Sequence, residues 1–237
     1  MDESLTDRRP DSRLLSIPSL RNLRDVGGCG PVRTGLLYRS ARLAELTPEG
    51  ARRLAELGLR TVVDLRDPIE LGRFPNLTHD WEVDLANFPL LPQDGRSHRD
   101  TPLAEVYPLI ADTAGPTLVA ILRRLLEPGA LPALVHCAVG RDRTGIVIAL
   151  LLALLDVPDE EIVADYLLSN EGLDLLEGPQ EYVDVHGTVR LSYPVTPELI
   201  TGVLARVRER HGSVAGYLAD HGLTSEEETA VCSMLRD

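Results

Sequence analysis

The spacing of apolar residues divides the chain into predicted strands and helices. The β-branched run at 60–65 (RTVVDL) and the apolar run at 133–137 (ALVHC) predict two buried strands. A third strand is predicted over 81–88, and a short extended stretch begins at Tyr38. Segments with helical spacing lie between these runs.

Those helices have recognisable starts and ends. Thr47 followed by Pro48 is typical of an N-cap with proline at the first helical position, and this helix is predicted to end at Gly58. Further helices are predicted over 116–126 and 143–155. The second of these is apolar on nearly all sides, as a central core helix should be.

Strands that alternate with helices predict one α/β domain, with a mostly parallel central sheet flanked by helices. After Pro158 the chain is predicted to be helical, apart from an irregular stretch near 187–195. The polar residues 1–15 are predicted to form a flexible N-terminal tail, and residues 16–237 the domain itself.

Composition and charge narrow the possible partners. The 237 residues carry a net charge of −13, which argues against binding to nucleic acid or anionic membrane, because both need a basic surface. The first residues lack a signal-peptide pattern, and the apolar run at 146–155 is shorter than the roughly 20 residues that span a bilayer. With three cysteines, an odd number, we expect a cytoplasmic protein with reduced thiols.

The segment 136–145 (HCAVGRDRTG) carries the candidate chemistry. It contains a cysteine, five further residues and an arginine, a spacing that is only weakly specific by itself. A histidine before Cys137, together with glycines at 140 and 145, makes a chance match far less frequent. The segment also follows a predicted strand and opens a predicted helix, which is the order that an anion-binding loop requires.

A loop of this length can turn its backbone N–H groups inward and bind an anion, helped by the positive end of the next helix. The same field favours the thiolate of Cys137, and Arg143 can offer two parallel N–H donors to phosphate. The candidate phosphate-binding residues are Ala138, Val139, Gly140, Arg141, Asp142 and Arg143. These features predict Cys137 as a nucleophile and Arg143 as the group that binds the phosphoryl oxygens. No cofactor or metal is expected, because no cluster of His, Cys and carboxylate residues has ligand spacing.

The same segment resembles the signature loop of the protein tyrosine phosphatase superfamily. It resembles most closely the bacterial family that includes the mycobacterial secreted tyrosine phosphatase B. Further segments are similar to motifs of that family, namely 22–28 (NLRDVGG), 38–40 (YRS), 63–66 (VDLR), 165–170 (DYLLSN) and 212–218 (GSVAGYL). The resemblance covers about residues 20–237 and implies a phosphatase that hydrolyses phosphate monoesters, phosphotyrosine above all.

The resemblance also implies roles for individual residues near the loop. Asp142 is implied as the general acid, with Asp64, Asp67 and Asp94 as alternatives. Thr144 is implied as a hydrogen-bond donor to the Cys137 sulfur, which would ease departure of the thiolate.

Other neighbours are expected to support the loop. Family members often have lysine where this chain has Arg141. This arginine is expected either to contact the leaving-group side of the substrate or to be solvated. His136 is expected to shape the loop from behind, and the pairs Arg24–Asp25 and Asp64–Arg66 to support it from beneath. Cys29 lies in a family motif expected near the pocket, so a reversible disulfide with Cys137 is a further alternative.

Three other functions remain open. The first is a phosphoinositide phosphatase that uses the same loop. The second is a rhodanese-like sulfurtransferase, which also has cysteine in an anion-binding loop, and the third is a non-catalytic phosphate-binding module. The ending Arg143-Thr144-Gly145 and the further motifs favour the phosphatase. The expected partner is a phosphorylated protein or a small phosphomonoester; the preference among tyrosine, serine and threonine, and the oligomeric state, remain open.

Overall fold

The structure, a computed structural model, describes residues 13–91 and 101–237; the predicted tail over 1–12 and Asp94 lie outside these ranges. Its centre is a five-stranded sheet in the order β1-β2-β5-β3-β4, in which all neighbours are parallel except β1 and β2. The strands are β1 (Arg24–Asp25), β2 (Leu37–Ser40), β3 (Thr61–Asp64), β4 (Asp84–Asn87) and β5 (Ala133–His136). The predicted α/β domain with a mostly parallel sheet is confirmed.

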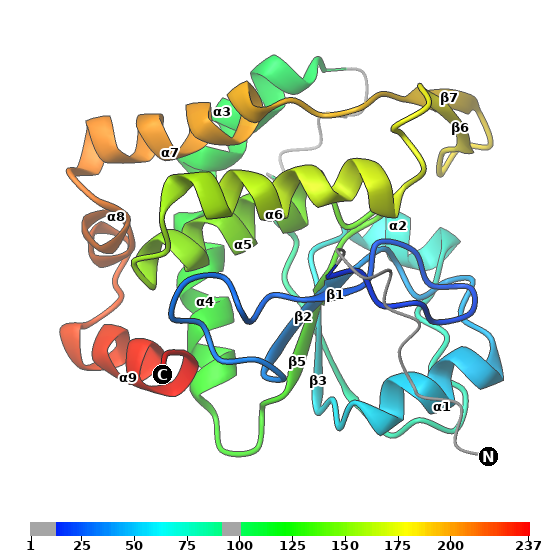
Figure 1. The fold of residues 1–237 in the computed structure, drawn as a ribbon, viewed down its shortest axis with the longest axis horizontal. Coiled ribbons are helices and arrows are strands. Elements are labelled where there is room, and N and C mark those ends of the chain that lie inside the picture. Colours follow the sequence, from blue (N-terminus) through cyan, green and yellow to red (C-terminus); the bar gives the residue numbers. More distant parts are fainter. Residues whose placement is uncertain (1–12, 92–100) are drawn as a thin grey trace.

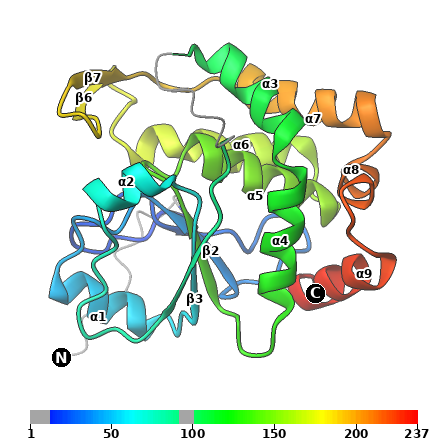
Figure 2. The ribbon, with the colours of Figure 1, turned by 180° about the vertical axis from the view of Figure 1, so that it is seen from behind.

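Helices cover both faces of this sheet. Helix α1 covers one face, and most of the other helices gather on the opposite face (Figures 1 and 2). The helices are α1 (Pro48–Glu56), α2 (Pro68–Arg73), α3 (Leu103–Thr113), α4 (Gly115–Leu126), α5 (Asp142–Leu154), α6 (Asp159–Gly172), α7 (Pro197–His211), α8 (Val214–Asp220) and α9 (Ser225–Leu235). None of the helices within 13–91 and 101–237 is long and apolar enough to cross a bilayer.

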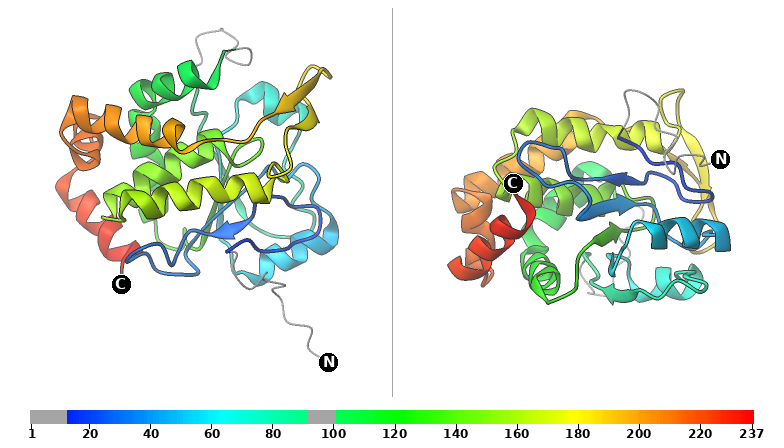
Figure 3. Two further views of the ribbon diagram at one scale, coloured as in Figure 1. Left: turned by 45° about the horizontal axis from the view of Figure 1, so that its top comes forward. Right: turned by 60° about the horizontal axis from the view of Figure 1, so that its bottom comes forward.

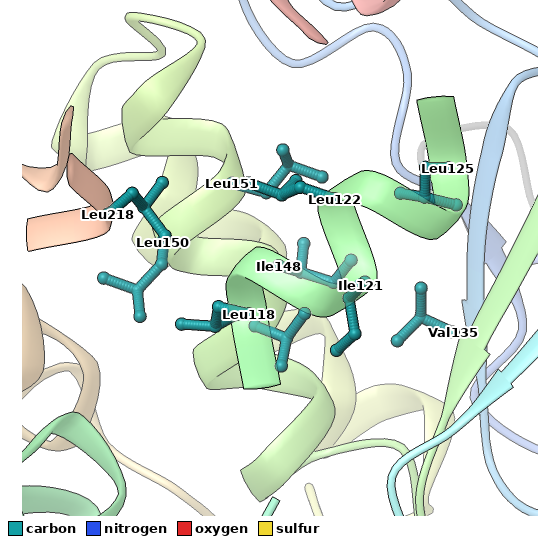
Figure 4. A pocket seen from close by; sticks show the side chains of 10 residues that line it. Leu118, Ile121, Leu122, Leu125, Val135, Ile148, Leu150, Leu151 and Leu218 are labelled. Atoms are coloured by element: carbon teal, nitrogen blue, oxygen red, sulfur yellow. The ribbon is translucent and has the colours of Figure 1, made fainter. Parts of the chain in front are cut away.

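Alternation along the central strands divides the core into two clusters. Val62 of β3 and Leu134 of β5 pack with Leu54 of α1, whereas Val63 and Val135 point to the other face. That second cluster contains the buried faces of α4 and α5. Figure 4 shows a wholly apolar pocket there, lined by Leu118, Ile121, Leu122, Leu125, Val135, Val147, Ile148, Leu150, Leu151 and Leu218. Because successive side chains of a strand point to opposite faces, these buried strands pack against helices on both sides of the sheet.

The register of the parallel strands aligns their carboxyl ends. Ser40 of β2 and Asp64 of β3 are both paired with His136, the last residue of β5. The segments that follow these three strands therefore leave the sheet at one edge. In open α/β sheets, ligands bind at this edge, and the loop that starts at Cys137 lies there.

The predicted start of α1 is confirmed, whereas two other predicted boundaries differ from the structure. Thr47 is the N-cap of α1, and its side-chain oxygen accepts a hydrogen bond from the Gly50 N–H at 3.2 Å. The strand expected over 81–88 is shorter than predicted and spans only Asp84–Asn87. Leu14 and Leu15, assigned to the tail from sequence, pair with the chain near β1, where the Leu15 N–H donates to the Leu23 carbonyl at 2.8 Å.

The C-terminal half departs from the prediction in one place. Between α6 and α7 the chain forms an antiparallel hairpin of β6 (Gln180–Val183) and β7 (Val189–Ser192), which projects at one end of the molecule (Figure 3). The expectation of helix up to 187 was wrong here. Asp184 closes the turn, because its Oδ1 accepts hydrogen bonds from the backbone N–H groups of His186 and Thr188.

Candidate active site

The loop after β5 is held in a conformation that requires glycine at one position. Gly140 has a φ of +68°, and a Cβ built there would lie 2.0 Å from the Ser40 carbonyl oxygen. Any side chain at 140 would therefore collide with the backbone at the end of β2, and the residue that carries it would also have to adopt an unfavourable left-handed φ. The sequence requirement for glycine at this place in the motif thus has a direct steric cause.

The carbonyl groups of the loop are turned outward toward donors on neighbouring segments. The Asn22 side chain donates to the carbonyls of Val139 and Gly140 at 3.1 and 3.0 Å, and Arg39 Nη2 donates to that of Gly140 at 2.8 Å. The Arg42 N–H donates to the Ala138 carbonyl at 3.1 Å. Within the described residues, the backbone N–H groups of 138–143 donate to no protein acceptor. Outward carbonyls and unengaged N–H groups make a backbone nest for an anion.

Cys137 is buried at the centre of this nest, with 2% of its surface exposed. The preceding His136 is fully buried and bonds through Nδ1 to the Cys137 carbonyl at 3.0 Å, while its Nε2 lies 3.6 Å from Asp64 Oδ2. Burial lowers the pKa of His136, although Asp64 opposes this. A neutral imidazole therefore donates its Nδ1 proton to that carbonyl and supports the loop from behind.

Asp64 is in turn held by Arg66. The Arg66 guanidinium donates from Nε to Asp64 Oδ1 at 2.9 Å and from Nη2 to Oδ2 at 2.7 Å. Burial would raise the pKa of Asp64, but the hydrogen bonds and charge of Arg66 lower it below its ordinary value. Since Asp64 also accepts from Asn76 at 2.9 Å, its carboxylate is occupied by structural bonds. The predicted Asp64–Arg66 pair is present at the edge of the sheet next to the loop.

Arg143 forms an ion pair with Glu70, a residue that the sequence analysis did not identify. Its Nη1 and Nη2 atoms donate to Glu70 Oε2 and Oε1 at 2.5 and 2.7 Å. Burial alone would lower the pKa of Arg143, but the hydrogen bonds and charge of Glu70 raise it above its ordinary value. Burial would conversely raise the pKa of Glu70, and Arg143 lowers it. Both groups are therefore charged.

Glu70 is itself positioned by the start of α2. The Glu70 N–H donates to the Asp67 side chain at 2.7 Å, and the Asp67 N–H donates back to Glu70 Oε2 at 3.1 Å. This reciprocal pattern is a capping box. The signal was visible in the sequence, because Asp67-Pro68 with Glu70 three residues after the cap predicts a helix start. It did not indicate that Glu70 would reach Arg143.

The hydrogen bonds to Glu70 leave one edge of the Arg143 guanidinium available to bind a ligand. Nη1 also donates to the Leu65 carbonyl at 3.4 Å. Among the described residues, no hydrogen bond uses Nε or the second N–H of Nη2. These two donors lie on one side of the planar group and can bind two oxygens of one phosphate in parallel.

Asp142 is the other carboxylate of the loop. Its Oδ1 accepts a hydrogen bond from the Tyr107 hydroxyl of α3 at 2.8 Å. The Tyr107 oxygen lies 2.5 Å from that of Tyr166 on α6, so Tyr166 donates to Tyr107. Burial raises the pKa of both phenols, and the Asp142 charge adds to the effect. Two protonated tyrosines thus hold the Asp142 carboxylate in place.

Arg141 is buried rather than solvated. It donates from Nε to Asp142 Oδ1 at 3.1 Å. Its Nη1 donates to the Ser192 hydroxyl and to the Tyr193 carbonyl, both at 2.8 Å. The expectation of solvation was wrong, since the buried side chain joins Asp142 to the β6–β7 hairpin. The expected contact with the leaving-group side of a substrate stays a prediction.

Thr144 makes no hydrogen bond to the Cys137 sulfur. Its hydroxyl is fully buried in α5 and has no hydrogen-bond partner in the described part of the chain. The implied donation to sulfur is therefore absent from this structure.

A buried carboxylate on α6 organises the arginines beneath the loop. Asp165 accepts from Arg24 Nε at 3.1 Å and from Arg39 Nη1 at 2.6 Å, with Arg13 adding a third contact at 2.9 Å. Burial would raise the pKa of Asp165, but the three arginines hold it well below its ordinary value. Burial and Arg39 lower the pKa of Arg24 to about 9.

The predicted Arg24–Asp25 pair is not formed. Adjacent residues of a strand point to opposite faces, so Arg24 faces Asp165 while Asp25 accepts hydrogen bonds from the N–H groups of Gly27 and Gly35 at 2.8 and 2.7 Å. Arg24 supports the loop through the Asp165 network, and Asp25 instead closes the turn before β2.

Cys29 is a buried free thiol. Arg13 Nη1 lies 2.7 Å from its sulfur, and burial raises its pKa despite that cation. Cys29, Cys137 and Cys232 are all unpaired thiols, so the alternative disulfide between the first two is not present in this structure.

Comparison with known proteins decides the family of this site. The model of the tyrosine phosphatase family matches residues 15–237, nearly the whole chain. The chain belongs to this family. The match includes the loop and every segment that holds it. Within the described residues, no group of three or more His, Cys, Asp or Glu side chains is placed to bind a metal ion in this tyrosine phosphatase.

This tyrosine phosphatase is similar to two curated phosphatases over most of their length. It is 29% identical over 266 residues to the triple specificity protein phosphatase PtpB of Mycobacterium tuberculosis, an alignment that covers 88% of this chain and 94% of the relative. It is 28% identical over 207 residues to the tyrosine-protein phosphatase of Nostoc commune, covering 80% of this chain and 70% of that one.

Solved structures similar to this tyrosine phosphatase have lower identity. The TpbA protein of P. aeruginosa is 19% identical with a TM-score of 0.44, covering 90% of this chain and 98% of that one. The core catalytic domain of the PP-IP phosphatase SIW14 from S. cerevisiae is 23% identical with a TM-score of 0.41, covering 65% and 78%.

Proposed function

We propose that this chain hydrolyses phosphate monoesters, with phosphotyrosine in proteins as its principal substrate, through a phosphocysteine intermediate on Cys137. One observation carries the proposal. A buried cysteine lies in a nest of outward-turned carbonyls, and the Arg143 guanidinium beside it is held by Glu70 with one donor edge unused. The names of the curated relatives as tyrosine and triple specificity phosphatases support the same substrate class.

In the first step, the Cys137 thiolate attacks phosphorus and an S–P bond forms while the bond to the leaving oxygen breaks. The loop N–H groups and Arg143 bind the three non-bridging oxygens and stabilise their charge in the transition state. Asp142, in its protonated form, transfers its proton to the departing phenolate. The products of this step are tyrosine and the phosphocysteine.

In the second step, water attacks the phosphocysteine. Asp142, now a carboxylate, takes a proton from that water, the S–P bond breaks, and inorganic phosphate leaves with the Cys137 thiolate restored. The hydrogen bonds from Tyr107 and Arg141 hold the Asp142 carboxylate in place beside the loop, where it can take this proton.

The experiment that tests this function is substitution of the nucleophile. Cys137→Ser should reduce release of phosphate from a phosphotyrosine peptide to below about 1% of wild type, because a serine hydroxyl cannot replace a thiolate here. The variant should still bind inorganic phosphate in calorimetry, because the nest and Arg143 remain. Cys232→Ser, which changes a thiol outside the loop, is the matched control and should keep full turnover. Turnover by Cys137→Ser above that level would exclude Cys137 as the attacking group.

A further inference from the structure

The β6–β7 hairpin has one face turned toward the phosphate-binding loop. Residues directly opposite each other in an antiparallel pair project to the same face. Gln180 pairs with Ser192 and Tyr182 pairs with Arg190, so these four side chains share a face. The Ser192 hydroxyl on that face accepts the hydrogen bond from Arg141, which shows that this is the face next to the loop.

Arg141 fixes the distance between hairpin and loop. Its guanidinium contacts the Ser192 hydroxyl, the Tyr193 carbonyl and the Asp142 carboxylate at the same time. Two of these contacts are to the hairpin and one is to the group that protonates the leaving oxygen. The inner face of the hairpin is therefore held beside the position that the leaving group of a bound substrate occupies.

Tyr182 is the aromatic residue of that inner face. It lies diagonally across from Ser192, and 44% of its surface is exposed. Burial raises the pKa of its phenol most strongly; Arg190 and Arg141 lower it, and Asp184 and Asp142 raise it. The ring is thus within electrostatic reach of Arg141 and Asp142 in the loop, while much of its surface is not covered by the protein.

We propose that Tyr182 forms one wall of the substrate site and packs against the phenyl ring of phosphotyrosine, which makes it a specificity-determining residue for aryl phosphates. The proposal rests on the proposed function and adds the residue that recognises the leaving group. A phenyl ring held between the loop and Tyr182 would bury apolar surface and form an aromatic pair.

The test compares two ligands that share phosphate but differ in the ring. Tyr182→Ala should raise KM for a phosphotyrosine peptide by about 2- to 12-fold, the range expected for loss of one aromatic pair. It should leave kcat and the inhibition constant of inorganic phosphate unchanged, because phosphate does not reach the hairpin. Tyr182→Phe, which keeps the ring, should behave as wild type.

Leu191→Ala is the matched control, because Leu191 is an exposed apolar residue of β7 that pairs with Glu181 on the outer face of the same hairpin. It should leave KM unchanged. Three results would contradict the ring contact. Tyr182→Ala could leave KM unchanged, or it could raise the inhibition constant of inorganic phosphate by the same factor as KM. Tyr182→Phe could also behave like Tyr182→Ala.

A binding measurement separates this proposal from the proposed function. The dissociation constant of the phosphotyrosine peptide is measured on Cys137→Ser and on Cys137→Ser with Tyr182→Ala, where no turnover is needed. A 2- to 12-fold weakening, about the range for one aromatic pair, supports the ring contact even if the wild type fails to release phosphate from this peptide. Equal binding by the two proteins overturns the ring contact, whatever the outcome for turnover.

Discussion

Glu70 holds Arg143 by two parallel hydrogen bonds, 2.5 Å from Nη1 and 2.7 Å from Nη2. The carboxylate belongs to the first turn of α2 and the guanidinium to the first turn of α5. An arginine at the start of a helix opposes the helix dipole, so its placement needs a compensating negative charge. Glu70 supplies this charge and orients the guanidinium before any substrate binds.

Glu70→Gln should therefore impair catalysis while leaving the fold intact. The amide keeps one acceptor but removes the charge that opposes Arg143, so kcat/KM for a phosphotyrosine peptide should fall by about 10- to 100-fold, as for other residues that orient a catalytic group. The control is Glu45→Gln, which changes an exposed carboxylate paired with Arg42. Similar kinetics for the two variants would contradict the orienting role.

Asp142→Asn should slow substrates according to their need for a proton. The loss should be small for nitrophenyl phosphate, whose phenolate leaves readily, and should approach about 10²- to 10⁴-fold for a phosphotyrosine peptide, the usual range of general acid catalysis. Steady-state kinetics on both substrates measures this. Equal losses on the two would indicate that Asp142 only holds the loop, and Asp64 would be the next residue to substitute.

Tyr107→Phe should affect the same step more weakly. It removes the 2.8 Å hydrogen bond to Asp142 but keeps the ring. Without that donor, the Asp142 carboxyl group is held less firmly in its position beside the loop. The value of kcat for a phosphotyrosine peptide should then fall, but by less than in Asp142→Asn. Tyr38→Phe, at a tyrosine of the opposite core cluster, should leave kcat unchanged. An unchanged kcat in Tyr107→Phe would show that Tyr107 does not position the acid.

Gly140→Ala should prevent the loop from forming. The new Cβ would overlap the Ser40 carbonyl, and the residue would also keep a left-handed φ. Turnover and phosphate binding should both be lost. Gly58→Ala separates the two causes, because Gly58 has a φ of +72° with open space around it. That variant should lose about 1 kcal/mol of stability, as expected for a left-handed alanine, with unchanged kinetics.

His136 should make stability depend on pH near neutrality. Its pKa in the folded protein lies below the ordinary value of 6.5, so between those values the unfolded chain binds a proton that the folded protein excludes. The contribution of His136 to the free energy of unfolding should be complete above about pH 6.5 and should be lost as the pH falls below it. Urea unfolding at a series of pH values measures this slope.

His136→Gln should flatten the slope in this range. Glu70, Asp64 and Asp165, whose pKa values are lowered from ordinary values of 4.5 and 3.8, lose their contributions only at more acidic pH. They should therefore leave the range just below pH 6.5 unaffected. An equal slope in wild type and His136→Gln would contradict the assignment.

The residues from Ala133 to Gly145 were predictable because strand, loop and helix are contiguous. Each of these features depends on neighbours in the chain, namely the β-branched and apolar run, the glycine at 140 and the apolar helix. Local signals of this kind can be recognised in a sequence before the fold is known. The same holds for the N-cap at Thr47. The Arg24–Asp25 pair and the solvated alternative for Arg141 were wrong, because each depends on which distant group a long side chain reaches.

Only the tertiary structure decided which side chains surround the loop. Glu70 lies 73 residues from Arg143, Tyr107 lies 35 from Asp142, and Ser192 lies 51 from Arg141. Periodicity shows which face of a helix or strand is buried, but not which other segment that face meets. These contacts exist because parallel pairing brings the ends of β2, β3 and β5 to one edge, where α2, α3 and the hairpin close around Cys137. The sequence by itself predicted the reacting group, and packing determined which charged and aromatic side chains surround it.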